Sequence, residues 1–323
     1  MQAALTLKEL GLDPVILEKT DRLGGKLNLW DRLFPTQTPA REVLEPYKKA
    51  VTDAGIEVRC NTGVEKLAAN GKGVVLADGT KFDAEGVVVA SGFDLFDARL
   101  KEEYGYGLYD NVITSADLEA MFKEHRVQLV NGDTPKRVAI LHCVGSRDAK
   151  VNQNHCSRVC CITGVKQAME IRQLYPDTEV FNFYMDMRMF GPGYEEIYRE
   201  SQEKYHVNHI RGRISEVSRT HEGKLLLKTE DTLIGRPMKM EVDLLVLLVG
   251  MCSAESNASL AESGKLGLRP SGFFDAVDSF AGNLRSANPA VFFAGTATAP
   301  KNVGESINDG IAAAHRVYQS IKR

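Results

Sequence analysis

The chain has 323 residues, of which 43% are hydrophobic and 26% are charged, with a formal net charge of −3. This length is enough for one large domain or two medium domains with their own cores. The balanced charge gives no reason to expect a nucleic-acid partner, and no apolar stretch approaches the roughly 18 residues of a membrane helix. The start, MQAALTLKEL, lacks the features of a signal peptide, so we expect a cytoplasmic protein.

The N-terminal stretch alternates between helical and extended patterns. Residues 2–11 predict an amphipathic helix closed by Gly11, and PVILE at 14–18 predicts a short strand that ends in an acid. A second helix is expected at 40–54, and another strand from 56 to 60. This order is typical of an α/β fold.

Two stretches of the chain resemble each other. Residues 64–92 and residues 214–250 each predict short strands joined by turns, and each ends in an apolar strand stopped by a glycine. Such apolar runs are typical of buried parallel strands. We therefore expect two related α/β units, with the second opening at the strand 137–142.

The last part of the chain is expected to return to the first unit. A buried strand at 291–295 and a final helix at 303–321 follow a polar loop. The predicted domains are residues 1–107 plus 277–323, and residues 108–276.

The first domain carries features of a dinucleotide site. Glu18 ends a strand, where a carboxylate can bind a ribose hydroxyl, and Gly24-Gly25 follow it. The strand VVVASG ends in Ala90, Ser91 and Gly92, small residues that permit a ligand to approach the backbone. The first strand and glycine-rich turn of such a site are missing before the helix at residue 2, so we expect weakened or absent flavin binding.

Four of the six cysteines lie within one segment, with the spacing Cys143-x12-Cys156-x3-Cys160-Cys161. Four thiolates suffice to hold a 4Fe–4S cluster. Zinc also accepts four cysteines, although the paired Cys-x2-Cys knuckles of structural zinc sites are absent. A third interpretation is a redox disulfide between Cys156 and Cys161. Cys60 and Cys252, beside apolar strands, are expected to be small core residues.

Four segments together resemble the A subunit of heterodisulfide reductase. They are EKTDRLGGKLNLWDRLFPT (18–36), HCVGSRD with HCSRVCCITGVKQA (142–168), DMRMFGPGYEEIY (186–198) and FFAGTATAPKNVGESI (292–307). The chain looks closest to the short A-like subunits of sulfur-oxidising bacteria.

The resemblance implies two Rossmann-like units in a thioredoxin-reductase-like arrangement, each with an inserted antiparallel β-meander. It implies FAD in the first unit, a 4Fe–4S cluster on the four clustered cysteines, and Lys166 near the reactive edge of the flavin. The implied flavin-binding residues, beyond those already named, are Lys19, Lys26, Leu27, Val64, Gly295, Lys301, Asn302 and Val303.

The resemblance also implies function and partners. The expected function is electron transfer between FAD and the cluster in sulfur or disulfide metabolism, as a homodimer that assembles with other heterodisulfide-reductase-like subunits and an electron carrier. The ferredoxin-type cysteine runs of the long methanogen subunits are absent. Two alternatives stay open: an NAD(P)H-dependent flavin disulfide reductase, and a cluster-bearing assembly subunit without flavin.

Overall fold

The computed structural model describes residues 1–322, which divide into two compact units. Unit 1 contains Met1–Asn28, Arg41–Asp94 and the chain from Met251 onward, and unit 2 contains Leu29–Ala40 and Leu95–Gly250. Two units were expected, but the boundaries differ from those predicted. Residues 29–40 and 95–107 fall in unit 2 and residues 251–276 in unit 1, so the chain crosses between the units at different places.

Unit 1 is built from short strands and from helices of different lengths. Its elements are α1 (Gln2–Glu9), β1 (Val15–Leu17), η1 (Gly25–Asn28), α2 (Ala40–Asp53, which starts at the unit boundary), β4 (Glu57–Arg59), β5 (Val64–Leu67), β6 (Gly73–Leu76), β7 (Lys81–Asp83), β8 (Val87–Val89), β18 (Met251–Ser253), α6 (Asn257–Gly264), β19 (Val291–Phe293), η5 (Gly295–Ala297) and α7 (Val303–Ile321). Strand β9 (Phe93–Leu95) lies at the boundary.

The parallel strands of unit 1 form two separate pairs. Strand β1 pairs with β4, and β19 pairs with β8. The predicted buried strand at 87–92 is shorter than expected: β8 has three residues, Val87 and Val88 are half-buried, and Ala90 is exposed. The reason is that β8 pairs along one edge only within the described chain.

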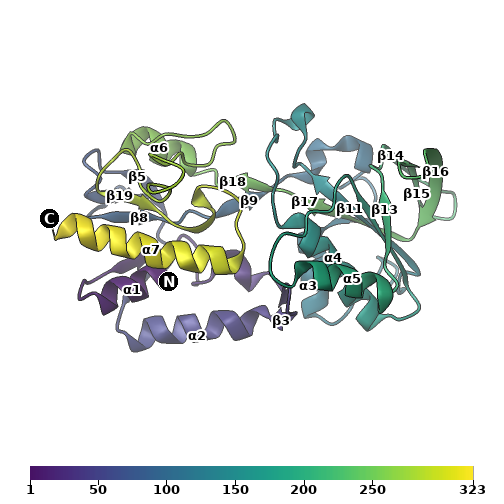
Figure 1. The fold of residues 1–323 in the computed structure, drawn as a ribbon, viewed down its shortest axis with the longest axis horizontal. Coiled ribbons are helices and arrows are strands. Elements are labelled where there is room, and N and C mark those ends of the chain that lie inside the picture. Colours follow the sequence, from purple (N-terminus) through teal and green to yellow (C-terminus); the bar gives the residue numbers. More distant parts are fainter. Residues whose placement is uncertain (323) are drawn as a thin grey trace. The chain divides into compact units, whose positions relative to one another are not determined.

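The first and last helices of unit 1 pack against each other, α7 running alongside α1 (Figure 1). Both were predicted, α7 at the bounds found. Gly11 follows α1 with a φ of 78°, in the left-handed region where glycine is favoured. Asn302 caps α7: its side chain accepts a hydrogen bond from the backbone N–H of Glu305, and the carboxylate of Glu305 accepts one from Asn302.

Unit 2 contains a larger sheet and its covering helices. Its elements are β2 (Arg32–Leu33), β3 (Thr38–Pro39), η2 (Ala98–Leu100), η3 (Glu102–Tyr104), β10 (Val112–Thr114), α3 (Ser115–Lys123), β11 (Arg137–Val144), η4 (Ala149–Val151), α4 (Cys160–Leu174), β12 (Glu179–Tyr184), α5 (Tyr194–Glu203), β13 (Asn208–Arg211), β14 (Glu216–Arg219), β15 (Leu225–Asp231), β16 (Arg236–Val242) and β17 (Leu244–Val249).

The sheet of unit 2 has five parallel strands in the order β10-β17-β11-β12-β13. Strands β17 and β11 are apolar and buried along nearly their whole length, as expected for parallel strands covered on both faces. Helix α4 packs on β11 and β12, and α5 packs on α4 (Figure 1).

Both predicted meanders are present. Strands β5-β6-β7 form a three-stranded antiparallel sheet in unit 1, and β14-β15-β16 form one in unit 2. The expected α/β class, with two related units and an inserted meander in each, is confirmed. No helix within residues 1–322 is both long and apolar enough to cross a bilayer.

Candidate functional site

Three of the four clustered cysteines meet at the carboxyl edge of the unit 2 sheet. Cys143 lies near the end of β11, and Cys160 and Cys161 form the first turn of α4. In a parallel α/β sheet, a strand's carboxyl end and the following helix's amino end lie at the same edge, which is where such folds bind ligands. All three cysteines are buried and belong to one apolar cluster with the strands below them. The first turn of α4 thus carries two of the four thiols.

The three thiols influence each other's ionisation. Hydrogen bonding with Cys160 is the main cause that lowers the pKa of both Cys143 and Cys161. The pKa of Cys160 is raised, mainly by its hydrogen bond with Cys143 and next by its hydrogen bond with Cys161. Cys160 is therefore the shared neighbour of the other two. His142, buried beside them, further lowers the pKa of Cys161.

Cys156 lies on the loop that follows β11. Its sulfur accepts a hydrogen bond of 3.3 Å from the backbone N–H of Arg158. Arg147 is the link to the buried thiols, because both Cys143 and Cys156 act electrostatically on its guanidinium. The structure thus brings together three predicted ligands and places the fourth beside a neighbour that they share.

The backbone around these cysteines is strained. Cys143, Arg147, Asn152 and Arg158 all have positive φ angles, of 62°, 55°, 56° and 61°. Each such conformation costs a non-glycine residue about 1–3 kcal/mol and persists where the surroundings enforce it. Strain of this kind clusters at binding sites, although no sequence pattern had marked these positions.

Ion pairs to one buried carboxylate hold the strained loop in place. Asp148, 3% exposed, lies 2.8 Å from the amine of Lys101 and 2.6 Å from the guanidinium of Arg213. Arg213 also donates a hydrogen bond of 3.3 Å to the hydroxyl of Tyr104. Sequence reasoning missed this anchor, because its members are far apart along the chain.

The donor set is chemically suited to an iron–sulfur cluster, which is held by four cysteine thiolates. All six cysteines are free thiols. Within residues 1–322, no three His, Cys, Asp or Glu side chains are already arranged about a common metal position. Cys60 and Cys252 are half-buried, not core residues as predicted, because they lie in or next to short strands of only three residues.

Lys166 occupies a closed ionic cluster within unit 2. Its side chain is 1% exposed, and its amine lies 2.6 Å from Glu119 and 2.8 Å from Glu170. Although burial acts against the charge, Glu170 and Glu119 raise the pKa of Lys166. Lys166 is therefore no solvated helix lysine, and its predicted role beside a flavin remains a prediction.

Two further groups complete this cluster. Glu119 accepts hydrogen bonds from the side-chain amide of Gln167 (2.7 Å) and from the backbone N–H of Asp31 (2.9 Å). Burial raises the pKa of Glu170 to about 7, against the opposing charge of Lys166. No sequence signal could have paired Glu119 with Lys166, since α3 and α4 are distant along the chain.

The predicted dinucleotide residues lie in unit 1. Glu18 follows β1, and its carboxylate accepts hydrogen bonds of 2.8 Å from the N–H and the hydroxyl of Thr20. Burial lowers the pKa of the Met1 amine, and Glu18 acts on it in the opposite direction, so the start of α1 lies near this carboxylate. A helix start beside a strand-end acid is the arrangement expected of a dinucleotide site.

The glycines predicted near the ligand have left-handed backbones. Gly25 and Gly92 have φ angles of 50° and 78°, and a Cβ at either would meet open space. Gly24 differs, because a Cβ there would come within 2.8 Å of Asn28 and Leu44. Gly25 and Gly92 thus leave room for a ligand, and Gly24 is needed for packing.

The remaining predicted residues on this side have varied surroundings. Lys26 places its amine 4.8 Å from the ring centre of Phe93 and 3.6 Å from Asp94, and burial lowers its pKa. The Ser91 hydroxyl donates a hydrogen bond of 2.8 Å to Asn257. Of the last three predicted residues, Lys19 is exposed, and Leu27 and Val64 are half-buried.

The start of α7 is enclosed, and its lysine is paired. Lys301 is 15% exposed and forms an ion pair with Asp309, which also accepts a hydrogen bond of 3.1 Å from the N–H of Gly295. The charge of Lys301 is therefore shared with a carboxylate. The Asn302 side chain caps the helix at Val303.

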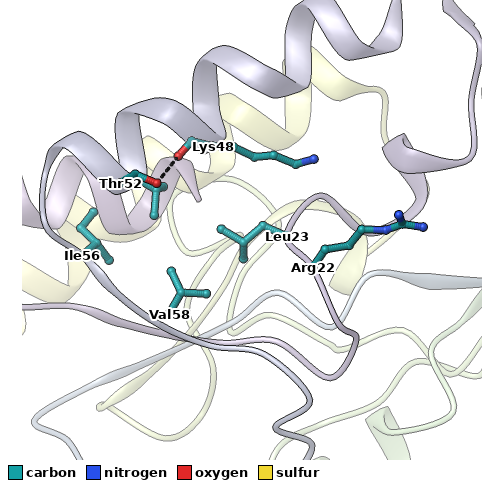
Figure 2. A pocket seen from close by; sticks show the side chains of 7 residues that line it. Arg22, Leu23, Lys48, Thr52, Ile56 and Val58 are labelled. Carbon is teal, nitrogen blue, oxygen red and sulfur yellow. Dashed lines mark hydrogen bonds between the residues drawn. The ribbon is translucent and has the colours of Figure 1, made fainter.

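One open pocket in unit 1 involves none of the predicted residues. It encloses about 440 Å³ and is lined by Arg22, Leu23, Lys48, Val51, Thr52, Ile56 and Val58. Figure 2 shows Arg22 and Lys48 extending their cationic ends toward the same side, while Thr52 donates a hydrogen bond to the backbone of Lys48. The lining residues come from α2, from β4 and the residue just before it, and from the loop that follows Glu18.

Comparisons with known proteins show which sequences and folds this chain is similar to. A model of the pyridine nucleotide-disulphide oxidoreductase family matches residues 1–117. The thioredoxin reductase of T. acidophilum has a similar fold, with a TM-score of 0.70 and 19% identity, over 100% of this chain and 95% of that chain.

Two relatives are similar in sequence. The iron-sulfur A subunit of the CoB–CoM heterodisulfide reductase of Methanocaldococcus jannaschii is 40% identical over 268 residues, which cover 81% of this chain and 40% of the relative. A second such A subunit, from Methanopyrus kandleri, is 31% identical over an alignment of 410 positions, which covers 99% of this chain and 62% of the relative. The chain thus spans only part of their length. On this similarity, the chain belongs to the family of heterodisulfide reductase A subunits.

Proposed function

We propose that this chain is an electron-transferring oxidoreductase subunit that binds FAD in unit 1 and one 4Fe–4S cluster in unit 2. The observation that carries the proposal is the set of three buried thiols that hydrogen-bond to one another at the carboxyl edge of the unit 2 sheet, with Cys156 on the adjoining loop. Support also comes from the relatives, which are named iron-sulfur subunits of heterodisulfide reductase.

The cluster would be held by Cys143, Cys156, Cys160 and Cys161. When bound, a 4Fe–4S cluster exchanges one electron at a time at a potential set by charge, hydrogen bonds and burial. The chain contributes a cation at Arg147, which lies near two of the thiols, and the anchor at Asp148 that fixes the loop. Burial among apolar side chains keeps water from the thiols.

FAD would be held by the strand-end and glycine positions of unit 1, with the weakened affinity that the sequence leads us to expect. When bound, FAD exchanges electrons singly or in pairs. Glu18 is suited to accept hydrogen bonds from ribose hydroxyls, and Gly25 and Gly92 leave room for the ligand beside the backbone. The amino end of α7, with its positive dipole, would favour negative charge on the ring.

The partners are proposed on the same basis. Since the relatives are subunits by name, we infer that the chain assembles with other subunits of a heterodisulfide-reductase-like complex and exchanges electrons with a carrier. A homodimer, a disulfide or related sulfur substrate, a cytoplasmic location and the closer likeness to short bacterial subunits remain predictions.

The test is the cofactor content of the purified chain and of serine variants. We expect about four irons and four sulfides per chain, lost in C143S, C156S, C160S and C161S and retained in C60S, which removes a thiol outside the set. Stoichiometric zinc, or equal iron in all five variants, would contradict the cluster. Flavin content measured on the same samples tests the proposed FAD site. A chain that holds the cluster but no flavin would support the alternative of a cluster-bearing assembly subunit.

A further inference from the structure

Four arginines and one exposed aromatic border the cysteine site on unit 2. They come from the loop after β11, the loop after β12 and the end of β13, and they form what is called here the arginine patch: Arg147, Arg158, Arg188, Phe190 and Arg211. These segments share the carboxyl edge of the sheet, because β11, β12 and β13 run parallel.

Asp186 organises three of the arginines. Its carboxylate lies 2.7 Å from Arg147, 4.0 Å from Arg188 and 4.0 Å from Arg211. The Nε of Arg211 also donates a hydrogen bond of 3.2 Å to the backbone of Met185. These three arginines less this carboxylate leave a local charge of +2, in a chain whose net charge is −3.

The aromatic member of the patch is presented outward. Phe190 is 61% exposed, and the guanidinium of Arg158 lies 5.5 Å from the centre of its ring. Arginine and aromatic side chains, phenylalanine included, are enriched in protein interfaces relative to the rest of the surface. The side chains of Arg188 and Arg211 are 43% and 46% exposed, so the patch is an open surface and not an enclosed site.

The patch also touches the thiols directly. The backbone N–H of Arg188 hydrogen-bonds to Cys161, and Arg147 lies near Cys143 and Cys156. Three methionines of the same covering loop, at 185, 187 and 189, pack on the apolar cluster that contains Cys160. A molecule seated on the patch would therefore lie directly over the cysteine site.

We propose that the arginine patch is the docking surface for a small acidic electron-carrier protein. The proposal rests on the proposed function of the cysteines beneath it. Opposite charge steers such a carrier to the patch and fixes its orientation, while Phe190 supplies an apolar contact. A protein fits better than a small anion, because the arginines are spread over three segments around an outward-facing ring.

The experiment measures the affinity of the full, cluster-reconstituted chain for an acidic bacterial ferredoxin at low and high salt. The double variant R188E/R211E removes the exposed cations and leaves the thiols in place, and F190A removes the apolar contact. R219E/R236E is the matched control, since it reverses two exposed arginines on β14 and β16. Iron content is measured on every variant.

We expect R188E/R211E to weaken binding by about tenfold or more and to flatten its salt dependence. F190A should weaken binding by about tenfold at both salt concentrations, and the control should stay within about twofold. Equal loss in patch and control variants, or no binding by the wild-type chain, overturns the proposal. So does a result in which pyrophosphate binds through these arginines and ferredoxin does not.

Iron content separates this proposal from the proposed function. A wild-type chain that holds iron but binds ferredoxin independently of the arginines overturns the docking surface alone. A chain that binds ferredoxin through the arginines but holds no iron overturns the cluster and leaves the docking surface standing.

Discussion

Lys166 neutralises two carboxylates that solvent does not reach. Glu119 and Glu170 are 2% and 3% exposed, and both lie within 2.8 Å of its amine. Charges removed from water to this degree are stabilised by each other and by hydrogen bonds, and removal of one partner leaves the others with the full cost of burial.

Replacing Lys166 with methionine should therefore destabilise the protein strongly. We expect K166M to lower the free energy of unfolding by about 3–5 kcal/mol, because two buried carboxylates lose their cation. Urea unfolding of the purified chain measures it. The control is K204M, which breaks a 2.9 Å ion pair with Glu200 on the surface and should change stability far less. Equal losses of unfolding free energy in both variants would show that the buried cluster stabilises the protein no more than a surface ion pair does.

The ionisation of Glu170 should make stability depend on pH. Burial raises its pKa to about 7 in the folded protein, above its ordinary value, so the folded state binds this proton more tightly than the unfolded state. Its contribution to stability is fully present below the unfolded pKa and is lost as the pH rises through about 7. Relative to wild type, E170Q should thus gain stability as the pH rises from about 5 to about 8. Parallel pH curves for E170Q and wild type, or the same gain in the exposed E203Q, would refute this assignment.

At the scale of elements, α7 depends on the residue pair at its start. Asn302 and Glu305 exchange hydrogen bonds at its amino end, next to the glycine turn that starts at Gly295. Reciprocal capping of this kind satisfies two backbone donors that the helix leaves unpaired.

Removing this cap should loosen the start of α7. We expect N302A to cost about 1 kcal/mol of unfolding free energy and to increase amide exchange in the first turn. S256A serves as the comparison, because the Ser256 side chain makes no capping hydrogen bond at α6. Similar losses in the two variants would mean that the capping hydrogen bonds are not the cause.

Elements with local signals could be predicted from the sequence. Helices α1, α2 and α7 follow apolar periodicity and their end signals, and strand β11 follows its apolar run. The four cysteines could be chosen because thiolate chemistry and spacing suffice to nominate a cluster. The extent of β8 could not be predicted, since it depends on which strands pair beside it.

Contacts between distant segments were beyond the sequence. The ion pairs of Lys166 with Glu119 and of Asp148 with Lys101 join residues 47 apart along the chain (166 − 119 and 148 − 101), and no periodicity encodes such pairs. The left-handed backbone of Arg147 could not be predicted from the sequence either. It is imposed by hydrogen bonds such as the one that its backbone N–H donates to the carbonyl of His155.

At the scale of the whole molecule, the two proposed cofactor sites belong to different units. The dinucleotide residues from Glu18 to Gly92 and from Gly295 to Val303 are in unit 1, and the cysteine set is in unit 2. Each unit has its own core, so the loss of one cofactor should not remove the other. C160S should therefore lose its iron while its flavin-to-protein ratio equals that of wild type. Loss of both cofactors together would show that the sites are interdependent.

The central claim is that four thiols of unit 2 bind one iron–sulfur cluster. Anomalous diffraction at the iron edge from crystals of the anaerobically purified chain tests it most directly. The account predicts one compact iron peak in contact with the sulfurs of Cys143, Cys156, Cys160 and Cys161. A peak elsewhere, a signal at the zinc edge alone, or a Cys156–Cys161 disulfide without iron would contradict it.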